Sequence, residues 1–385
     1  MKRILAAAVG IALLGLLPLG AGAATLAEAG KSAVLMDVTT GTVLYEHNSH
    51  EALAPASVTK VMTMLLIMEA VDSGKIALTD TVTASEAAAA KGGSQIYLKA
   101  GETMSVSDML KSIAVSSAND CACAMAEHIC GSESAFVEAM NRRAKELGMQ
   151  DTHFVNCTGL DDDDSAKLHR TSAYDIALMS RELLKNHPDI KKYTTIWMDT
   201  VRNGAFGLSN TNKLIRFYPG ATGLKTGYTA GAGYCLSASA QKEGMELIAV
   251  VMGAKTSQAR NAACKELLDY GFANFAVVAP EPEELPQVAV RLGKQTQVPV
   301  KMEETAGMLI EKSQRSGITT EISLEDSVAA PVVRGQTLGS LSVKSGEQTL
   351  RQIPLVAAED VERLSTGDIF LAVLRRAAMA KEERE

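Results

Sequence analysis

Ser57-Val58-Thr59-Lys60 opens a long apolar stretch that continues as Val61-Met62-Thr63-Met64-Leu65-Leu66-Ile67-Met68. Pro55, just before it, favours the start of a helix. A helix that is apolar at nearly every position is expected to be buried on most sides, so this one should form the centre of a domain. Because Ser57 and Lys60 are three residues apart on the helix, their side chains should share a face and can hydrogen-bond directly.

Strands are predicted on both sides of this helix. Two precede it, around residues 33–36 and 43–45, and two follow much later, around 235–239 and 247–251. Further helices are expected at 107–115, 120–129, 136–147 and 258–270. The order predicts an α+β domain with an antiparallel sheet, in which the first and last strands belong to the same sheet.

The C-terminal third should form a separate unit. Residues 280–284, Pro-Glu-Pro-Glu-Glu, indicate a linker, and short β-rich runs with glycine turns from 288 to 355 predict a small all-β domain. A helix is expected from about 368 to 381, with an apolar side next to several basic residues. Such an amphipathic helix can lie flat on an anionic membrane. The alternative is a helix that packs only on protein.

The N-terminus indicates export. Lys2 and Arg3 precede an almost wholly apolar run from Ile4 to Leu19, and Ala21-Gly22-Ala23 offers a cleavage site. An uncleaved anchor is the alternative. The expected segments are a signal peptide at 1–23, the α+β domain at 24–276, the β-rich domain at 277–360 and the amphipathic helix, a possible membrane anchor, at 361–385. We expect the mature protein to work outside the cytoplasm.

Composition excludes several classes of function. The net charge of -7 comes with no basic tract, which argues against nucleic acid as a partner. Six cysteines in an exported chain allow disulfides, but no pair has C-x-x-C spacing, and buried free thiols are the expectation. The six histidines are scattered, with no H-E-x-x-H motif. We therefore expect neither a metal site nor a cofactor.

Two further motifs contain residues that can act together with Ser57 and Lys60. Ser117-Ala118-Asn119 is expected on a turn between two helices, and Lys225-Thr226-Gly227 just before a strand. A serine hydroxyl needs a base, and Lys60 can serve only when uncharged. Burial and a second cation, for which Lys225 is the natural candidate, both lower the pKa of Lys60.

Each remaining candidate residue has an expected role. Ser117 would relay a proton to a leaving amine, and Asn119 would bind a substrate amide. Lys225, with Thr226 or Thr229, can hold a carboxylate, while Gly227 leaves room for a substrate along the sheet edge. Two further candidates have weaker signals: Arg260 is either a carboxylate ligand or a solvated arginine, and His169 either borders the cleft or is structural.

At these motifs the sequence resembles the low-molecular-mass penicillin-binding proteins, the serine-type D-alanyl-D-alanine carboxypeptidases. The likeness extends to Thr158-Gly159-Leu160-Asp161-Asp162, Leu267-Leu268-Asp269-Tyr270-Gly271-Phe272 and Ala330-Pro331-Val332-Val333-Arg334-Gly335-Gln336. One departure is visible: the family commonly has glycine where this chain has Ala118. The added methyl group is expected to be tolerated, although it can trim the pocket or slow the enzyme.

The resemblance implies a β-lactamase/transpeptidase-like fold and removal of the terminal D-alanine from peptidoglycan pentapeptide stems. It implies acylation of Ser57, an oxyanion hole made by the backbone N–H groups of Ser57 and Tyr228, and covalent inhibition by β-lactam antibiotics. It also implies a location at the outer face of the cytoplasmic membrane, reached through the C-terminal helix.

Two other functions remain as alternatives. A β-lactamase shares the motifs but needs a glutamate followed at fixed spacing by Leu-Asn, and Glu182-Leu183-Leu184-Lys185-Asn186 has the wrong spacing. A non-catalytic wall-binding protein would have no need of an activated serine. A zinc peptidase lacks ligands here, and a lipase-type hydrolase lacks its G-x-S-x-G turn.

Overall fold

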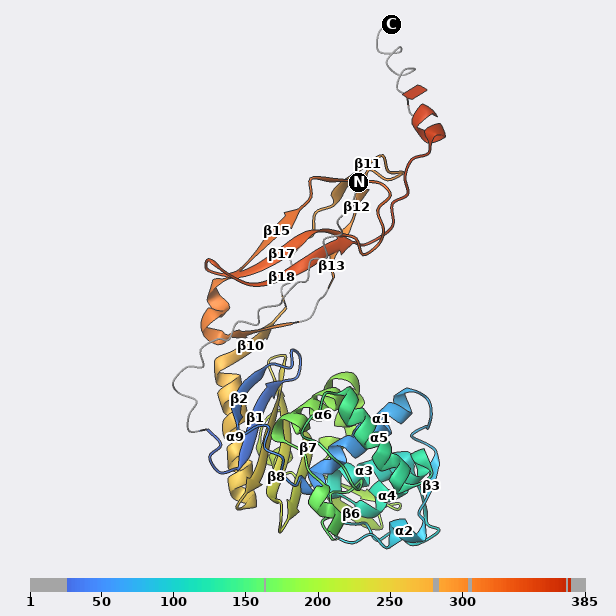
Figure 1. Ribbon diagram of the computed structural model, residues 1–385, viewed down its shortest axis with the longest axis vertical. Coiled ribbons are helices and arrows are strands. Elements are labelled where there is room, and N and C mark those ends of the chain that lie inside the picture. The colour runs from blue at the N-terminus through green and yellow to red at the C-terminus, as the bar shows by residue number, and fades with distance from the viewer. Residues whose placement is uncertain (1–25, 163, 280–283, 304–306, 372, 375–385) are drawn as a thin grey trace, which may run out of the picture.

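The computed structural model describes residues 26–162, 164–279, 284–303, 307–371 and 373–374. The predicted signal peptide, most of the predicted linker and the end of the tail helix lie outside this range. An α+β domain occupies the lower part of Figure 1, and a β-rich domain extends above it. This arrangement confirms the predicted fold class, an α+β domain followed by a smaller all-β domain.

A five-stranded antiparallel sheet in the order β2-β1-β9-β8-β7 forms one side of the first domain. As predicted, the first and last strands share one sheet. The structure adds that they are neighbours, because β1 pairs with β9. Val34 and Met36 of β1 face one hydrophobic core, whereas Ala33 and Leu35 face a second core. The sheet is therefore buried on both faces, which explains why its strands are nearly continuous apolar runs. The strand bounds are β1 (Ser32–Asp37), β2 (Val43–His47), β7 (Ala221–Thr229), β8 (Gly233–Lys242) and β9 (Met245–Ala254).

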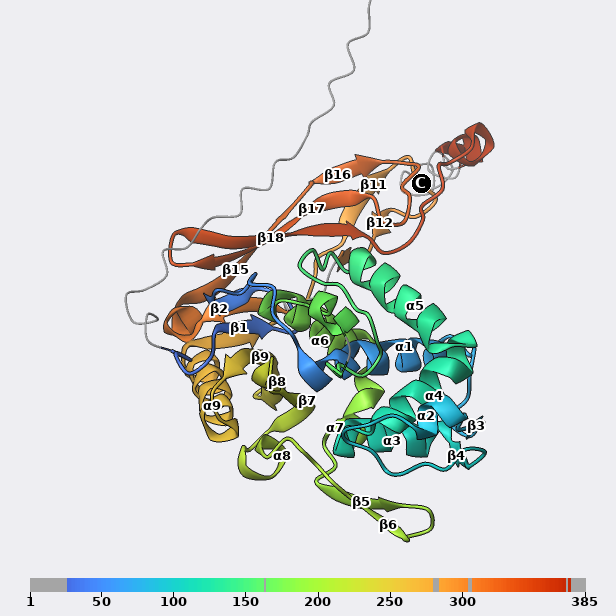
Figure 2. The same ribbon diagram turned by 60° about the horizontal axis from the view of Figure 1, so that its bottom comes forward.

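Helices cover both faces of the sheet (Figure 1). Helix α9 (Ser257–Asn274) packs on one face, and α1 with α3 to α6 lies on the other. These are α1 (Lys60–Asp72), α3 (Val106–Ser116), α4 (Asn119–Cys130), α5 (Glu133–Glu146) and α6 (Ala173–Asn186). Shorter elements are α2 (Glu86–Ala89), α7 (Lys191–Thr194), α8 (Leu214–Phe217), β3 (Thr81–Thr83), β4 (Thr103–Ser105), η2 (Asp164–Leu168) and η3 (Pro188–Ile190). The hairpin of β5 (Met198–Val201) and β6 (Phe206–Ser209) projects from the domain in Figure 2.

Helix α1 is the buried centre that its sequence predicts. It follows a short 3-10 helix, η1 (Ala56–Thr59), which holds Ser57, and its first residue is Lys60. Along α1 the side chains from Lys60 to Leu65 are all fully buried. A helix of this kind depends on tertiary packing on every side, and here α3, α4, α5 and α6 provide that packing.

The motif Lys225-Thr226-Gly227 precedes β8, as predicted, but it also lies within a strand of its own, β7, which we did not predict. The structural requirement for glycine at position 227 also differs from the one that we expected. A Cβ at Gly227 would lie 2.7 Å from the carbonyl oxygen of Pro55 and 3.0 Å from the amide nitrogen of Ser57. Only a residue without a side chain allows β7 to lie this close to η1.

The second domain consists of strands around its own hydrophobic core. β10 (Phe275–Val278) continues directly from α9 and pairs with β14, so the expected boundary at 276/277 falls inside a strand. A three-stranded sheet has the order β12-β11-β16, and a four-stranded sheet has the order β13-β18-β17-β15. Their bounds are β11 (Val288–Arg291), β12 (Gln297–Val298), β13 (Val300–Met302), β14 (Met308–Glu311), β15 (Ile318–Leu324), β16 (Ser327–Ala329), β17 (Thr337–Ser345) and β18 (Gln348–Ala357), with η4 (Lys312–Gly317) between β14 and β15.

The tail helix begins at residue 366, after the β-rich domain is complete. Val361 is still buried and pairs with Val332, so the domain extends past the expected boundary at 360. Ser365 explains the helix start, because its hydroxyl accepts a hydrogen bond from the backbone N–H of Asp368 at 3.1 Å. Phe370 and Val373 are exposed. In the part of the chain that the structure describes, no helix is both long and apolar enough to cross a membrane.

We predict that Gly227→Ala destabilises the protein by about 1–3 kcal/mol, because the added Cβ must push β7 away from η1. Gly207 in β6 provides the matched control, since a Cβ there would meet no heavy atom within 4 Å. Thermal unfolding should give a lower melting temperature for Gly227→Ala and a nearly unchanged one for Gly207→Ala. Equal melting temperatures would mean that the close approach of β7 to η1 does not require a glycine.

Candidate active site

Ser57 and Lys60 form a direct contact at the junction of η1 and α1. The Nζ atom of Lys60 lies 3.0 Å from the Oγ atom of Ser57 and 2.8 Å from the backbone oxygen of Thr158. Lys60 is fully buried, whereas Ser57 is partly accessible. The hydroxyl can therefore meet a substrate while the amine next to it is kept from water.

Burial changes the proton affinity of Lys60. It lowers the pKa of the amine to about 7, because the charged form loses its solvation. Cys157 and the carboxyl group of Asp120 act in the opposite direction but do not offset the burial. At neutral pH a large fraction of Lys60 is therefore uncharged and can accept a proton.

Lys225 is a second buried amine at the same site. Its Nζ donates to the backbone oxygen of Thr226 at 2.9 Å. Burial lowers the pKa of Lys225 well below its ordinary value, and the positive charges of Lys60 and Arg260 lower it further. Because the two lysines share a region of low polarity, a charge on one disfavours a charge on the other.

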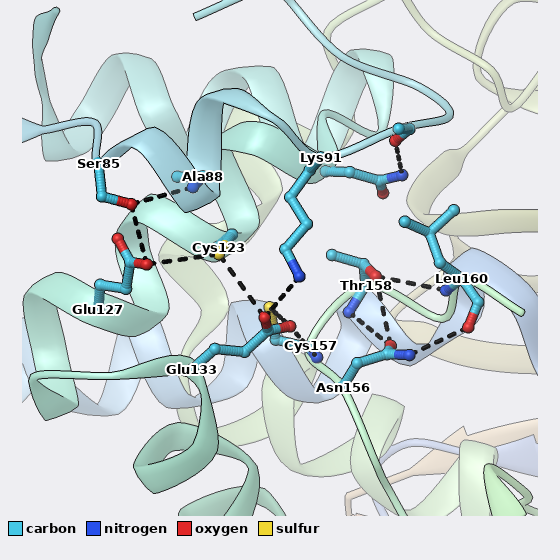
Figure 3. A network of polar contacts seen from close by, with 12 residues as sticks. Ser85, Ala88, Lys91, Cys123, Glu127, Glu133, Asn156, Cys157, Thr158 and Leu160 are labelled. Carbon is cyan, nitrogen blue, oxygen red and sulfur yellow. Dashed lines mark hydrogen bonds and ion pairs between the residues drawn. The ribbon is translucent and has the colours of Figure 1, made fainter. Parts of the chain in front are cut away.

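A tight turn after residue 155 supplies the acceptor for Lys60. The side-chain oxygen of Asn156 accepts hydrogen bonds from the backbone N–H groups of Thr158 at 3.2 Å and Gly159 at 2.7 Å. Its side-chain nitrogen donates to the backbone oxygen of Leu160 at 3.0 Å (Figure 3). Asn156 thus holds the turn in the shape that points the Thr158 carbonyl at the amine.

The same turn is fixed from the side of α5. Glu133 accepts hydrogen bonds from the backbone N–H of Cys157 at 3.3 Å and from its thiol at 3.2 Å. Lys91 pairs with the other oxygen of Glu133 at 2.6 Å (Figure 3). Lys91, Glu133 and Cys157 therefore link three separate segments behind the site.

All six cysteines lie in the described part of the chain, and each is a free thiol. All except Cys130 are buried. Burial raises the pKa of the Cys123 thiol to about 12 and that of Cys157 above its ordinary value, and nearby Glu133 raises both further.

The Ser117-Ala118-Asn119 motif lies at the turn between α3 and α4, as predicted. Ser117 adopts a left-handed conformation with φ of 63° at the end of α3. The side-chain nitrogen of Asn119 donates to the backbone oxygen of Gly92 at 2.7 Å. The Oγ of Ser117 and the Oδ1 of Asn119 are buried and have no hydrogen-bond partner among the described residues. Buried polar atoms of this kind are costly, and a ligand can satisfy them.

Asp120, next in the chain, shapes the loop beside Asn119. Its carboxylate accepts hydrogen bonds from the backbone N–H groups of Ile96 at 3.1 Å and Leu98 at 3.0 Å. Between these two residues Tyr97 has φ of 60° and is 67% exposed. We did not predict this role, because a lone aspartate in a sequence does not indicate which distant amides it will bind.

β7 brings the third motif to the other two. The hydroxyl of Thr226 donates to that of Thr211 at 2.7 Å, and the backbone N–H of Thr211 donates to the oxygen of Val115 at 3.2 Å. We did not predict a role for Thr211 either. Tyr228 is exposed and stacks on Tyr234 with 4.3 Å between ring centroids. Thr229 ends the strand, where its hydroxyl accepts a hydrogen bond from the backbone N–H of Ala232 at 3.1 Å.

Arg260 and His169 are both buried. Arg260 donates from Nη1 to the backbone oxygen of Cys235 at 3.3 Å, and its guanidinium lies 5.9 Å from the ring centroid of Tyr234. It is therefore not the solvated helix arginine of the alternative interpretation. His169 lies next to η1, with Nε2 2.7 Å from the hydroxyl of Thr59.

One group of possible metal ligands occurs in the described residues, at the far end of α1. Ligand atoms of Glu69, Glu182 and His187 lie within 4.8 Å of one another. Arg143 donates to both carboxylates at 2.7 Å, so their charges are already paired by a guanidinium. We assign no metal to this group.

Comparison with known proteins places the chain in a family. Residues 21–256 match the model of the D-alanyl-D-alanine carboxypeptidase family, and residues 279–363 match the C-terminal domain of penicillin-binding protein 5. The chain is 45% identical to the D-alanyl-D-alanine carboxypeptidase DacF of Bacillus subtilis (strain 168), over 98% of each chain. It is 35% identical to DacC of Escherichia coli (strain K12), over 86% of this chain and 83% of that one.

Solved structures agree with this assignment. Penicillin-binding protein 5 from Haemophilus influenzae is similar with a TM-score of 0.75 and 31% identity, over 87% of this chain and 98% of that chain. Penicillin-binding protein 6B from Escherichia coli is similar with a TM-score of 0.70 and 32% identity, over 85% of this chain and 95% of that chain. The chain belongs to the D-alanyl-D-alanine carboxypeptidase family, that is, to the low-molecular-mass penicillin-binding proteins.

Proposed function

We propose that this serine-type D-alanyl-D-alanine carboxypeptidase removes the terminal D-alanine of peptidoglycan pentapeptide stems through an acyl-enzyme on Ser57. The observation that carries the proposal is the contact of 3.0 Å between the Ser57 hydroxyl and Lys60. A lysine with a pKa of about 7 is matched to general-base work at neutral pH. Serine and base are already in place before any substrate binds.

The reaction then proceeds in two stages. Lys60 takes the proton of Ser57 as Oγ attacks the carbonyl carbon of the penultimate D-alanine. The backbone N–H groups of Ser57 and Tyr228 would stabilise the oxyanion. Ser117 relays the proton taken up by Lys60 to the amine of the terminal D-alanine as its C–N bond breaks, which leaves Lys60 uncharged again. Water then attacks the ester, releases the shortened stem and restores Ser57.

Substrate binding uses the unpaired groups around this centre. The Oδ1 atom of Asn119 is positioned to accept an N–H of the stem peptide, since it has no partner among the described residues. β7 is an edge strand, and an extended peptide can pair with its outer side at Gly227. Lys225 with Thr226 or Thr229, and Arg260 behind them, would hold the terminal carboxylate. A bound carboxylate favours the charged form of Lys225.

The alternatives fit the site less well. A β-lactamase needs a glutamate that activates water, and the candidate Glu182 instead binds Arg143 at 2.7 Å. A wall-binding module would gain nothing from a buried lysine with a lowered pKa, which is a feature of catalytic sites. Penicillin should nevertheless acylate Ser57. In support, penicillin-binding protein D2 from Listeria monocytogenes, 32% identical with a TM-score of 0.58, has been solved in an ampicillin-bound form.

The proposed location is extracytoplasmic, at the outer face of the cytoplasmic membrane. The N-terminal pattern of the sequence predicts export. The exposed apolar residues of the tail helix, Phe370, Leu371, Val373 and Leu374, together with the basic residues predicted to follow, suit adsorption to an anionic lipid surface.

Ser57→Ala should abolish both covalent labelling by penicillin and removal of the terminal D-alanine, because no other group supplies the attacking oxygen. Ser73→Ala, at the opposite end of α1, is the matched control and should behave as wild type. Mass spectrometry of the protein and of pentapeptide stems measures both outcomes. An adduct on Ser57→Ala protein would assign the nucleophile to another residue.

The acylation rate should rise with pH through about 7, since only uncharged Lys60 accepts the proton of Ser57. Below that value we expect a decrease of about tenfold per pH unit, and above it a plateau. Rapid-mixing measurements with a chromogenic penicillin from pH 5.5 to 8.5 follow the rate. Lys60→Arg, which stays charged at every pH used, should be inactive throughout. A flat profile in folded protein would exclude Lys60 as the base.

Deletion of residues 366–385 should release the protein from membranes. This deletion leaves Val361 and Arg363 in place, and both pair with the β-rich domain. Sedimentation with anionic vesicles should fall to background for the shortened chain and for full-length Phe370→Asp/Leu374→Asp protein, while penicillin labelling is retained. Unchanged sedimentation would remove the anchoring role of the tail.

A further inference from the structure

The residue before the proposed nucleophile has an unusual backbone. Ala56 is not a glycine, yet its φ is 48°, and it is 2% exposed. A side-chain-bearing residue persists in this region only when its surroundings hold it there. The hydroxyl of Thr59 does so by donating a hydrogen bond to the carbonyl oxygen of Ala56 at 2.8 Å.

This carbonyl controls the direction of the Ser57 amide. The C=O of Ala56 and the N–H of Ser57 belong to one planar trans peptide unit, so they point in opposite directions. A carbonyl held towards Thr59 therefore turns the N–H away from Thr59. Gly227 of β7 also comes close to the Ser57 nitrogen, since a Cβ there would lie 3.0 Å from it. Within the described residues no hydrogen bond uses this N–H.

His169 fixes the proton of the Thr59 hydroxyl. Its Nδ1 accepts a hydrogen bond from the backbone N–H of Val155 at 3.1 Å, so the ring proton must be on Nε2. Nε2 lies 2.7 Å from the Thr59 hydroxyl, which must then donate onwards to the Ala56 carbonyl. This series of hydrogen bonds starts at the Val155 N–H, which can only donate, and ends at the Ala56 carbonyl, which can only accept. Each proton between them therefore has one possible position.

The ring is suited to remain in this neutral form. Burial, with the nearby charges of His153 and Lys60, lowers the pKa of His169 to about 4. Phe154 packs against the ring with its edge, at 5.6 Å between centroids. The ring therefore has one tautomer and one orientation at neutral pH.

The contacts of His169 join two segments that both line the site. Val155 begins the turn whose Thr158 carbonyl binds Lys60, and Thr59 immediately precedes Lys60. Gly159 of the same turn has φ of +81°, and a Cβ there would lie 1.8 Å from the Ala56 oxygen. The turn therefore packs directly on the peptide unit that the histidine orients.

We propose that His169 is a positioning residue, which acts through Thr59 to hold the Ala56–Ser57 peptide so that the Ser57 N–H faces the oxyanion formed in the reaction. This inference rests on the proposed function, because it assigns a purpose to the N–H group of the nucleophile. His169 itself touches neither substrate nor reacting atoms.

Thr59 provides the sharpest test, since Thr59→Ser keeps the hydroxyl and Thr59→Val removes it at almost unchanged volume. Thr59→Val and His169→Phe should each lower the first-order acylation constant by about tenfold to a hundredfold, a part of the effect known for loss of an oxyanion donor. The dissociation constant of the non-covalent penicillin complex should stay within about twofold of wild type. Thr59→Ser, and His153→Gln at the exposed neighbouring histidine, should retain wild-type rates.

A peptidyl boronic acid gives a second readout that a merely structural role would not change. Its tetrahedral adduct on Ser57 places an oxygen where the oxyanion forms. Its affinity should fall in Thr59→Val and His169→Phe by the same factor as the acylation constant. Melting temperatures show which variants are folded, and if His169→Phe does not fold, the comparison of Thr59→Val with Thr59→Ser decides.

Two results would overturn the inference: equal acylation constants for Thr59→Val and Thr59→Ser, or a loss confined to the non-covalent dissociation constant. These results differ from a failure of the proposed function. If Ser57→Ala abolishes the penicillin adduct while folded Thr59→Val and His169→Phe retain wild-type rates, Ser57 remains the nucleophile and only the positioning role is lost. If Ser57→Ala keeps the adduct, the proposed function fails as well.

Discussion

The structure depends on keeping one amine out of water beside one hydroxyl. Lys60 can act on Ser57 only while uncharged, and the apolar surroundings of α1 supply the condition. This condition has a cost in stability. The folded protein has a Lys60 pKa of about 7, whereas an unfolded lysine has one near 10.5, so the unfolded chain binds more protons between these values. The free energy of unfolding is therefore reduced by the full amount below about pH 7, and this reduction disappears as the pH rises from about 7 to 10.5.

Backbone groups, rather than side chains, complete the surroundings of the amine and the hydroxyl. The Thr158 carbonyl binds Lys60, and the Ala56 carbonyl is held by Thr59. Gly227 and Gly159 allow two other segments to approach η1 closely from different directions. Small displacements of η1 would therefore affect the proposed nucleophile, the proposed base and the proposed oxyanion donor together. Such coupling is expected of a site in which several groups must keep their places before the substrate arrives.

The sequence predicted what is carried by residue type and spacing. Three residues of separation put Ser57 against Lys60, and short runs of apolar residues predicted strands of the sheet. It did not predict contacts made by backbone atoms, because every residue has the same carbonyl. Thus Thr158 was seen only as part of a resemblance, and Gly227 was assigned to substrate rather than to η1. Long-range side-chain partners such as Thr211 were missed for a similar reason: nothing local marks them.

The reactivity of the buried cysteines described above reports on local unfolding of the α+β domain. Burial raises the pKa values of Cys235 to about 11 and of Cys264 to about 12, so almost no thiolate exists in the native state at neutral pH. Thiolate is the form that reacts with alkylating agents and disulfides. These thiols can therefore be modified only when local unfolding exposes them to solvent. The rate of modification then measures how often the domain opens. In the extracytoplasmic location that we propose, the same burial would keep these thiols from reacting with the disulfides and oxidants of that compartment.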